Sequence, residues 1–128
     1  MADKKLILLV DDDPDFVEAV RVIVENGGYE VEVAYDGQEG LEAVAERKPD
    51  LIVLDVMMPV MNGHEACAKL KASKDTEEIP IILLTAVADR VTTSTYTHRD
   101  MLESEAEDYM PKPVEPAELL ERIKSWVS

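Results

Sequence analysis

The sequence predicts an α/β fold built on a doubly wound parallel sheet, arranged as a (βα)5 sandwich. Continuous apolar runs of strand length occur at residues 6–10, 51–54 and 80–84, as expected for strands that are buried on both faces. Segments with apolar residues at helical spacing separate the runs. Because helices must cover both faces and each crossover is right-handed, the strand order 2-1-3-4-5 follows if the winding reverses after the second strand.

The first half of the chain predicts the order strand, helix, strand, helix. The first helix has an Asp-Pro pair at its start and a Gly pair at its end, which are the usual signals for the two helix termini. Between these signals, Phe16, Val20, Ile23 and Val24 recur at helical spacing, which indicates one apolar face. The second strand alternates glutamate with apolar residues, a pattern typical of a half-exposed edge strand. The expected elements are a strand at 6–10, a helix between Asp13 and Gly27, a strand at 29–34 and a helix from Asp36 to near Lys48.

The second half continues the alternation but contains one region that local patterns leave undefined. Residues 88–108 hold five hydroxyl residues between Thr92 and Thr97 and few periodic apolar positions, so the region of the fourth helix is expected to be atypical. The expected elements are a strand from 51 to Asp55, a helix at 63–73, a strand at 80–84, a short strand ending near Met110, and a last helix with Leu119, Leu120, Ile123 and Val127 at core spacing.

Length and charge limit the functions that fit this chain. Its 128 residues fit one domain over 1–128, and 28 acidic against 13 basic residues give a formal net charge of −15. This charge opposes binding to nucleic acid or to an anionic membrane surface, so we expect neither as a direct partner. The single Cys67 cannot form an internal disulfide, and the apolar run near the start is too short for a signal peptide or a membrane span. We expect a cytoplasmic protein.

Residues that can carry chemistry follow or end four of the predicted strands. In an open α/β sheet, ligands bind at the carboxyl ends of the strands, and neighbouring strands lie about 4.8 Å apart, so these side chains should gather at one spot. Lys112 lies two strands from Asp55, about 10 Å away, a distance that its long side chain can largely cover. The candidate residues are Asp11 and Asp12 after the first strand, Asp55 at the end of the third, Thr85 after the fourth and Lys112 after the fifth.

A cluster of three aspartates requires a cation. Without one, the carboxylates would repel one another and raise each other's pKa, which would make Asp55 a poor nucleophile. Oxygen ligands with open coordination positions suit Mg²⁺. A carboxylate nucleophile, a metal, a lysine and a hydroxyl together are the parts of a phosphoryl-transfer site, so an aspartyl phosphate on Asp55 is the expected product.

Four motifs resemble the receiver domains of bacterial two-component response regulators, the CheY-like superfamily. They are VDDDP at 10–14, LIVLDVMMPVMNG at 51–63, PIILLTA at 80–86 and YMPKP at 109–113. One such motif alone is weak, but four in order, each at a strand end and spread over nearly the whole chain, are highly specific. The resemblance implies a flavodoxin-like (βα)5 sandwich that acts as a phosphoacceptor signalling switch.

The resemblance also implies how phosphate and metal are bound. Asp55 would accept the phosphoryl group from the phosphohistidine of a sensor histidine kinase or a phosphotransfer protein. Mg²⁺ would be held directly by Asp12, Asp55 and the backbone carbonyl of Met57, and by Asp11 through water. The domain would then be the substrate and a weak self-catalyst of its phosphorylation and dephosphorylation, and not a turnover enzyme.

Further implications concern the response to phosphorylation. Lys112 would contact the phosphoryl group, and Thr85 and Tyr109 would be the switch residues. Readout would use the face formed by the fourth helix, fifth strand and fifth helix, where an output partner, an effector domain or a second copy in a phosphorylation-dependent homodimer would bind.

The chain departs from the family pattern near that face. The interval from Thr85 to Lys112 is longer than usual, and Glu-Ala-Glu-Asp precedes Tyr109 where a Gly-Ala pair is expected, so the turn into the last strand needs another backbone solution. We expect this region to be tailored to a particular partner. Met57 and Val87 stand two positions after Asp55 and Thr85, and because neither readily orients a water molecule, self-dephosphorylation should be slow.

Three other classes of protein share parts of this pattern. A phosphatase of the haloacid dehalogenase type would need a second aspartate at position 57, which is Met. A flavodoxin-like cofactor binder would need a first loop that accepts phosphate, and Asp11 to Asp13 would repel it. An unphosphorylated pseudo-receiver that acts only as a binding module is the remaining alternative, and the complete acidic set, Thr85 and Lys112 argue against it.

Overall fold

A computed structural model describes residues 4–56, 63–86, 106–112 and 114–127, and the structural statements that follow concern these residues. Their centre is a parallel sheet of five strands in the order β2-β1-β3-β4-β5. The strands are β1 (Leu6–Val10), β2 (Glu30–Ala34), β3 (Leu51–Asp55), β4 (Ile81–Ala86) and β5 (Asp108–Lys112). The helices are α1 (Pro14–Asn26), α2 (Gly37–Glu46), α3 (Gly63–Lys71) and α6 (Pro116–Val127).

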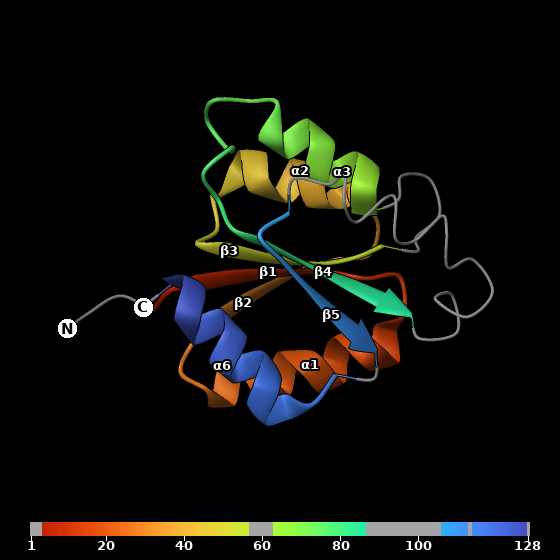
Figure 1. Cartoon of the computed structure of the whole chain (residues 1–128), viewed down its shortest axis with the longest axis vertical. Helices are drawn as coiled ribbons and strands as arrows, with labels where there is room; N and C mark the ends of the chain where they lie inside the picture. Colours follow the sequence, from red (N-terminus) through yellow and green to blue (C-terminus); the bar gives the residue numbers. More distant parts are fainter. Residues whose placement is uncertain (1–3, 57–62, 87–105, 113, 128) are drawn as a thin grey trace.

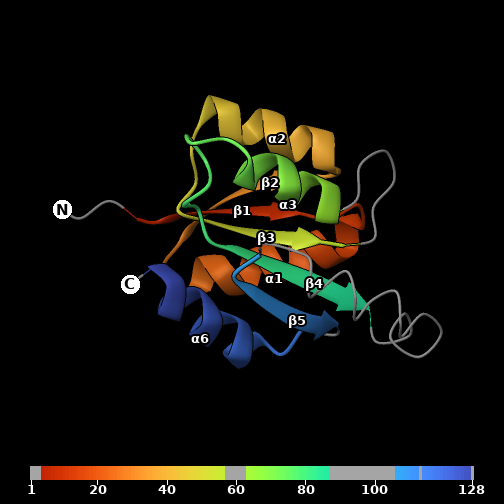
Figure 2. The same cartoon turned by 45° about the horizontal axis from the view of Figure 1, so that its top comes forward.

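Helices cover both faces of the sheet. Helices α2 and α3 lie on one face and α1 and α6 on the other, as Figures 1 and 2 show from two directions. Successive residues of β1 point to opposite faces, so that Leu8 packs in the core under α2 and α3 while Ile7 and Leu9 pack in the core under α1 and α6. Burying one such side chain contributes about 1.5–3 kcal/mol to stability. Because the central strands are buried on both faces, their packing holds in place the edge of the sheet that carries the candidate site.

The fold class and strand order predicted from the sequence are confirmed. Strand β2 is the half-exposed edge strand that its alternation indicated, and Cys67 is buried as a small core residue. The predicted fourth helix and its atypical region fall almost entirely within 87–105, outside the described residues.

Two strand ends differ from the prediction. The fourth strand was expected to cover residues 80–84 and end at Thr85, and the fifth to end near Met110, but β4 continues to Ala86 and β5 to Lys112. The two strands extend together, because Thr85 pairs with Pro111 and Ala86 with Lys112. Proline, which lacks an N–H, is tolerated there since β5 is an edge strand of the sheet.

Glu107 fixes the start of β5 through its backbone and its side chain. Its own N–H donates to the carbonyl of Ile81 at 3.0 Å, and its Oε1 accepts the N–H of Ile81 at 2.8 Å. Its Oε2 lies 2.7 Å from the Nζ of Lys71, whose side chain is 4% exposed. The side chain of Glu107 therefore joins the start of β5 to the start of β4 and to the end of α3.

No helix in the described part of the chain is long and apolar enough to cross a membrane.

Candidate functional site

The loop between β1 and α1 orders the first two parts of the site. Asp13 caps α1 by accepting hydrogen bonds from the backbone N–H groups of Asp15 (3.0 Å) and Phe16 (3.4 Å). The backbone N–H of Asp13 in turn donates to Oδ1 of Asp11 at 3.0 Å. One short turn therefore fixes both the orientation of the Asp11 carboxylate and the start of the helix that carries Phe16.

Gly63 fixes the backbone that carries Asp55. Its N–H donates to the carbonyl of Val56 at 2.9 Å. A Cβ at this position would lie 2.3 Å from the Asp55 carbonyl oxygen and 2.8 Å from the Val56 Cα, distances that real Cβ atoms do not adopt. Only glycine lets α3 begin so close to the end of β3, and the glycine that ends the second sequence motif has this packing role.

Asp11, Asp12 and Asp55 form an acidic cluster at the carboxyl ends of β1 and β3. One carboxylate oxygen from each lies within 4.8 Å of the others. Asp11 and Asp55 are buried, at 2% and 4% exposure, whereas Asp12 is exposed. The cluster therefore combines two desolvated carboxylates with one that faces water, and the mutual repulsion of these charges favours a bound cation.

Lys112 reaches the cluster from the end of β5. Its Nζ donates to Oδ2 of Asp11 at 2.9 Å and lies 3.3 Å from Oδ1 of Asp55. Burial lowers the pKa of Lys112, but the hydrogen bonds and negative charges of Asp11 and Asp55 outweigh burial, so its pKa is raised above the usual value and the ammonium stays charged. The expected reach of this side chain across two strands is confirmed.

Phe16 borders the site as well as the core. The Nζ of Lys112 lies over its ring, 4.4 Å from the centroid. Helical spacing indicated that Phe16 faces the sheet, and it does pack against the core under α1 and α6. The position of Phe16 in the first turn after three aspartates was the only signal that its ring would also border the site.

The other predicted residues have different surroundings. Thr85 is buried, one residue after Leu84, which pairs with Asp55. Tyr109 is half-buried and packs against the core under α2 and α3. Met57 and Val87 lie outside the described residues, so the carbonyl ligand and the two positions linked to slow dephosphorylation remain predictions.

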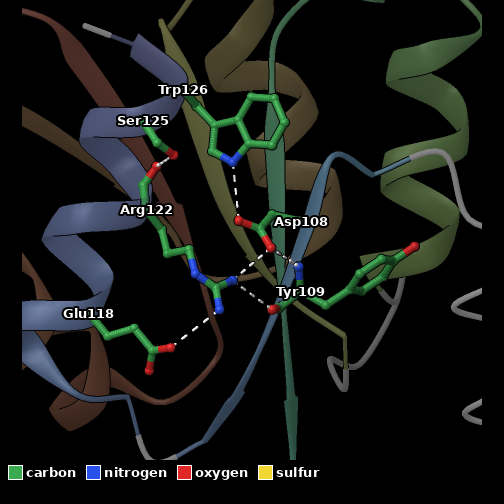
Figure 3. A network of polar contacts seen from close by, with 6 residues as sticks. All are labelled: Asp108, Tyr109, Glu118, Arg122, Ser125 and Trp126. Carbon is green, nitrogen blue, oxygen red and sulfur yellow. Dashed lines mark hydrogen bonds and ion pairs between the residues drawn. The ribbon is translucent and has the colours of Figure 1, made fainter.

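A polar network covers the surface between β5 and α6 (Figure 3). The guanidinium of Arg122 donates to Oδ1 of Asp108 at 2.7 Å and to the carbonyl of Tyr109 at 3.1 Å, and the indole N–H of Trp126 donates to Oδ2 of Asp108 at 3.1 Å. The ring of Tyr109 points away from this network. The two sides of β5 therefore differ: one faces the α2/α3 core, and the other is tied to α6 by Asp108.

The donor set of the acidic cluster fits Mg²⁺. All its side-chain ligands are carboxylate oxygens, the kind of ligand that Mg²⁺ prefers, and Asp12 is exposed, so this side of the cluster is in contact with solvent. The nearby ammonium can bond a further phosphoryl oxygen. The geometry can thus bind a divalent cation and a phosphoryl group beside Asp55.

Comparison with known proteins points to one family. The response regulator receiver domain family matches residues 7–124. The DNA-binding response regulator MtrA of Mycolicibacterium smegmatis is 39% identical over 122 residues, covering 95% of this chain and 50% of that protein. Response regulator MprA of Mycobacterium leprae is 44% identical over 122 residues, covering 93% and 49%. The chain therefore spans about half the length of these curated relatives.

Solved structures agree with this match. The signal receiver domain of a signal transduction histidine kinase from Syntrophus aciditrophicus superposes with a TM-score of 0.88 at 34% identity, covering 96% of this chain and 89% of that one. The receiver domain of a sensor histidine kinase from Pseudomonas aeruginosa, with a magnesium ion coordinated in its active-site cleft, has a TM-score of 0.85 at 26% identity and covers 98% of both chains. Similar receivers thus occur in both response regulators and histidine kinases.

Proposed function

The chain belongs to the response regulator receiver domain family, and on that premise we propose that it is a phosphorylation-dependent signalling switch whose phosphoacceptor is Asp55. The main support for this proposal is the position of Asp55, a buried carboxylate that lies beside the carboxylates of Asp11 and Asp12 and the ammonium of Lys112. We take residues 1–128 as one receiver domain.

Asp55 is the nucleophile in this proposal. A carboxylate oxygen of Asp55 attacks the phosphorus of a phosphohistidine, a P–O bond forms as the P–N bond breaks, and the imidazole leaves with the electron pair and takes up a proton. The donor would be a sensor histidine kinase or a phosphotransfer protein. The chain supplies a positioned acceptor and its own electrostatic environment, so it acts as a substrate with weak self-catalysis and not as an enzyme that turns over.

Asp11, Asp12 and Asp55 would hold Mg²⁺, with the backbone carbonyl of Met57 as a further ligand. Bound there, Mg²⁺ would neutralise negative charge on the phosphoryl oxygens. The neighbour from Pseudomonas aeruginosa, which has magnesium in its active-site cleft, supports this assignment. Asp11 already accepts hydrogen bonds at both carboxylate oxygens, which favours a role through water for this residue.

Lys112 and Thr85 would bond the phosphoryl oxygens, Lys112 with its ammonium and Thr85 with its hydroxyl. Thr85 and Tyr109 would then report phosphorylation to the surface of β5 and α6. An output partner, an effector domain or a second copy in a phosphorylation-dependent dimer would read this surface. Because Met57 and Val87 do not readily orient a water molecule, the aspartyl phosphate should be long-lived.

The partners and the location belong to the same proposal. The net charge of −15 argues against nucleic acid binding by these residues themselves. One relative, about twice as long as this chain, is named a DNA-binding response regulator, however. The comparisons therefore do not support the expectation that the protein makes no direct contact with nucleic acid. We infer a cytoplasmic location from the lone cysteine and from the kinase donor that the reaction needs.

Intact mass after incubation with acetyl phosphate and Mg²⁺ tests the proposal. The wild type should gain one phosphoryl group, and Asp55→Asn should gain none. Asp13→Asn is the matched control, because Asp13 lies outside the acidic cluster and asparagine still caps a helix, and it should be modified like the wild type. An unmodified wild type, or a modified Asp55→Asn variant, would instead favour the pseudo-receiver alternative or another acceptor.

A further inference from the structure

Phe16 lies at the junction of the core and the acidic cluster. Among the residues that the structure describes, three groups surround the ammonium of Lys112: Oδ2 of Asp11 at 2.9 Å, Oδ1 of Asp55 at 3.3 Å, and the ring of Phe16 with its centroid at 4.4 Å. An ammonium over an aromatic ring at this distance is attracted by the negative face of the ring, and the attraction grows when the pair is partly desolvated. The ring is the only one of these three contacts that carries no charge.

Phe16 packs against the core without being fully enclosed by it. Phe16 is half-buried, and beside it lies a cavity of about 10 Å³ that Asp11 and Val17 also line, so the ring is not enclosed on all sides by close contacts. The Asp13 cap fixes the backbone of Phe16 at the first turn of α1. The same turn orients Asp11, so the ring and the carboxylate that hold Lys112 are set by one local structure.

The charged contacts of Lys112 are the ones that a metal would change. Asp11 and Asp55 are both candidate ligands of Mg²⁺, and a divalent cation among these carboxylates would weaken their hold on the ammonium and repel it. The side chain of Lys112 is 25% exposed and flexible, so it could move into solvent. The ring of Phe16 is a contact for which the metal does not compete.

We propose that Phe16 is a positioning residue for Lys112, keeping the ammonium beside Asp55 through a cation–π contact when the carboxylates are engaged by the metal and the phosphoryl group. This inference rests on the proposed function, since it concerns how Lys112 is held for the phosphoryl oxygens. Leucine would occupy much of the same space without the negative ring face, whereas tyrosine would retain that face.

A double-mutant cycle without metal tests the contact itself. Urea unfolding is measured for the wild type, Phe16→Leu, Lys112→Met and the double variant in the presence of a chelator. A cation–π contact predicts a coupling that corresponds to a factor of about three to ten in the folding equilibrium. Additive effects of the two substitutions would overturn the inference, because a residue that only packs against the core has no specific coupling to the ammonium.

Phosphorylation kinetics then test the positioning role. With saturating Mg²⁺ and acetyl phosphate, Phe16→Leu should be phosphorylated about three- to tenfold more slowly than the wild type. Phe16→Tyr should restore most of the rate. Val24→Ala, a cavity-forming change in the same helix, is the control for general loosening of α1 and should keep the wild-type rate. A Leu variant as fast as the wild type, or a Tyr variant as slow as the Leu variant, would overturn the role.

The two experiments separate this inference from the proposed function. A wild type that takes up no phosphoryl group would overturn the proposed function, and the role of Phe16 with it. A wild type that is phosphorylated normally, with no coupling between Phe16 and Lys112, would overturn the role of Phe16 alone.

Discussion

The ammonium of Lys112 and the carboxylate of Asp11 are joined by a 2.9 Å hydrogen bond, although the two residues are 101 positions apart in the chain. This bond links the end of β5, an edge strand, to the end of β1, which lies beyond β4 and β3 in the sheet. Since Asp11 is buried, the ammonium is its local counter-ion. The ion pair therefore places a positive charge where the proposed function requires a divalent cation.

Replacing Lys112 with methionine should strengthen metal binding. In this variant, Mg²⁺ no longer competes with the Lys112 ammonium for the carboxylates of Asp11 and Asp55, and it is no longer repelled by that positive charge. We therefore expect the affinity of the protein for Mg²⁺ to rise about three- to tenfold. Isothermal titration calorimetry with MgCl₂ measures this change. Lys124→Met, at an exposed position on α6, removes the same charge away from the site and should leave the affinity within error. Weaker binding by Lys112→Met would contradict the competition.

Asp12→Asn should be more stable than the wild type without metal and less stable than the wild type with Mg²⁺. Asp12 is the exposed member of the cluster, and its removal relieves repulsion. We expect Asp12→Asn to be more stable than the wild type by about 0.5–1 kcal/mol in a chelator. At Mg²⁺ concentrations about 100-fold above the dissociation constant, the wild type should gain about 2.7 kcal/mol and the variant much less. Urea unfolding of both proteins, in a chelator and in Mg²⁺, tests this reversal. An equal gain in the free energy of unfolding on adding Mg²⁺ would refute it.

The candidate site could be predicted because its geometry follows from strand topology. Asp11, Asp12 and Asp55 follow or end apolar runs, and parallel strands bring their carboxyl ends to one edge. Once the strand order was known, Lys112 could be placed within reach of Asp55. That order followed from the alternation of strands and helices, so no individual side-chain contact had to be known in advance.

The remaining parts depend on contacts that periodicity does not encode. The pattern of α1 indicated which face Phe16 occupies, but not that an ammonium from β5 would lie over its ring. Lys71 stands at the charged end of α3 and would be taken for an exposed residue. It can be buried because its Nζ donates hydrogen bonds to two backbone carbonyls and to the carboxylate of Glu107, which is far along the chain. Such partners become visible only when the strands are assembled.

Lys71→Met should destabilise the fold much more than the substitution of an exposed lysine does. The Nζ of Lys71 donates to the carbonyls of Glu77 (2.9 Å) and Ile79 (2.8 Å) and to the carboxylate of Glu107 (2.7 Å), and methionine would leave these acceptors unsatisfied. We expect a loss of about 2–4 kcal/mol in the free energy of unfolding, measured in urea. Lys69→Met, at an exposed position of the same helix, should change stability by less than about 0.5 kcal/mol. Equal losses in the two variants would show that the buried bonds contribute little.

The ion pair between Glu30 and Arg47 should make stability depend on pH. The hydrogen bond from Arg47 lowers the pKa of Glu30 below its usual 4.5, against a smaller opposing effect of burial. A lowered carboxyl pKa stabilises the fold at pH values above 4.5, and this contribution is lost as the pH falls through the pKa of the folded state. Arg47→Gln should therefore be less stable than the wild type at pH 7, with a difference that shrinks in acid. Lys48→Gln, an exposed neighbour, serves as the control, and a difference that grows in acid would contradict the sign.

Asp108 connects β5 to α6, and its removal should be detectable at Trp126. The carboxylate accepts the Arg122 guanidinium at 2.7 Å and the Trp126 indole N–H at 3.1 Å (Figure 3). We expect Asp108→Ala to lower the free energy of unfolding by about 1–2 kcal/mol, followed by circular dichroism. Since Trp126 is the only tryptophan in the sequence, its emission should shift in the folded state.

Glu118→Ala provides the comparison, because Glu118 pairs with the same guanidinium from an exposed position one helical turn away. Exposed pairs of this kind contribute about 0.3–0.5 kcal/mol, so its loss should be small and Trp126 emission unchanged. If the two variants behaved alike, α6 would be held to β5 mainly by the burial of Leu119 and Ile123 in the core, and not by the Asp108 network. If they differ as expected, Trp126 becomes a spectroscopic reporter on the proposed readout surface, and phosphorylation of Asp55 that alters this surface should change its emission.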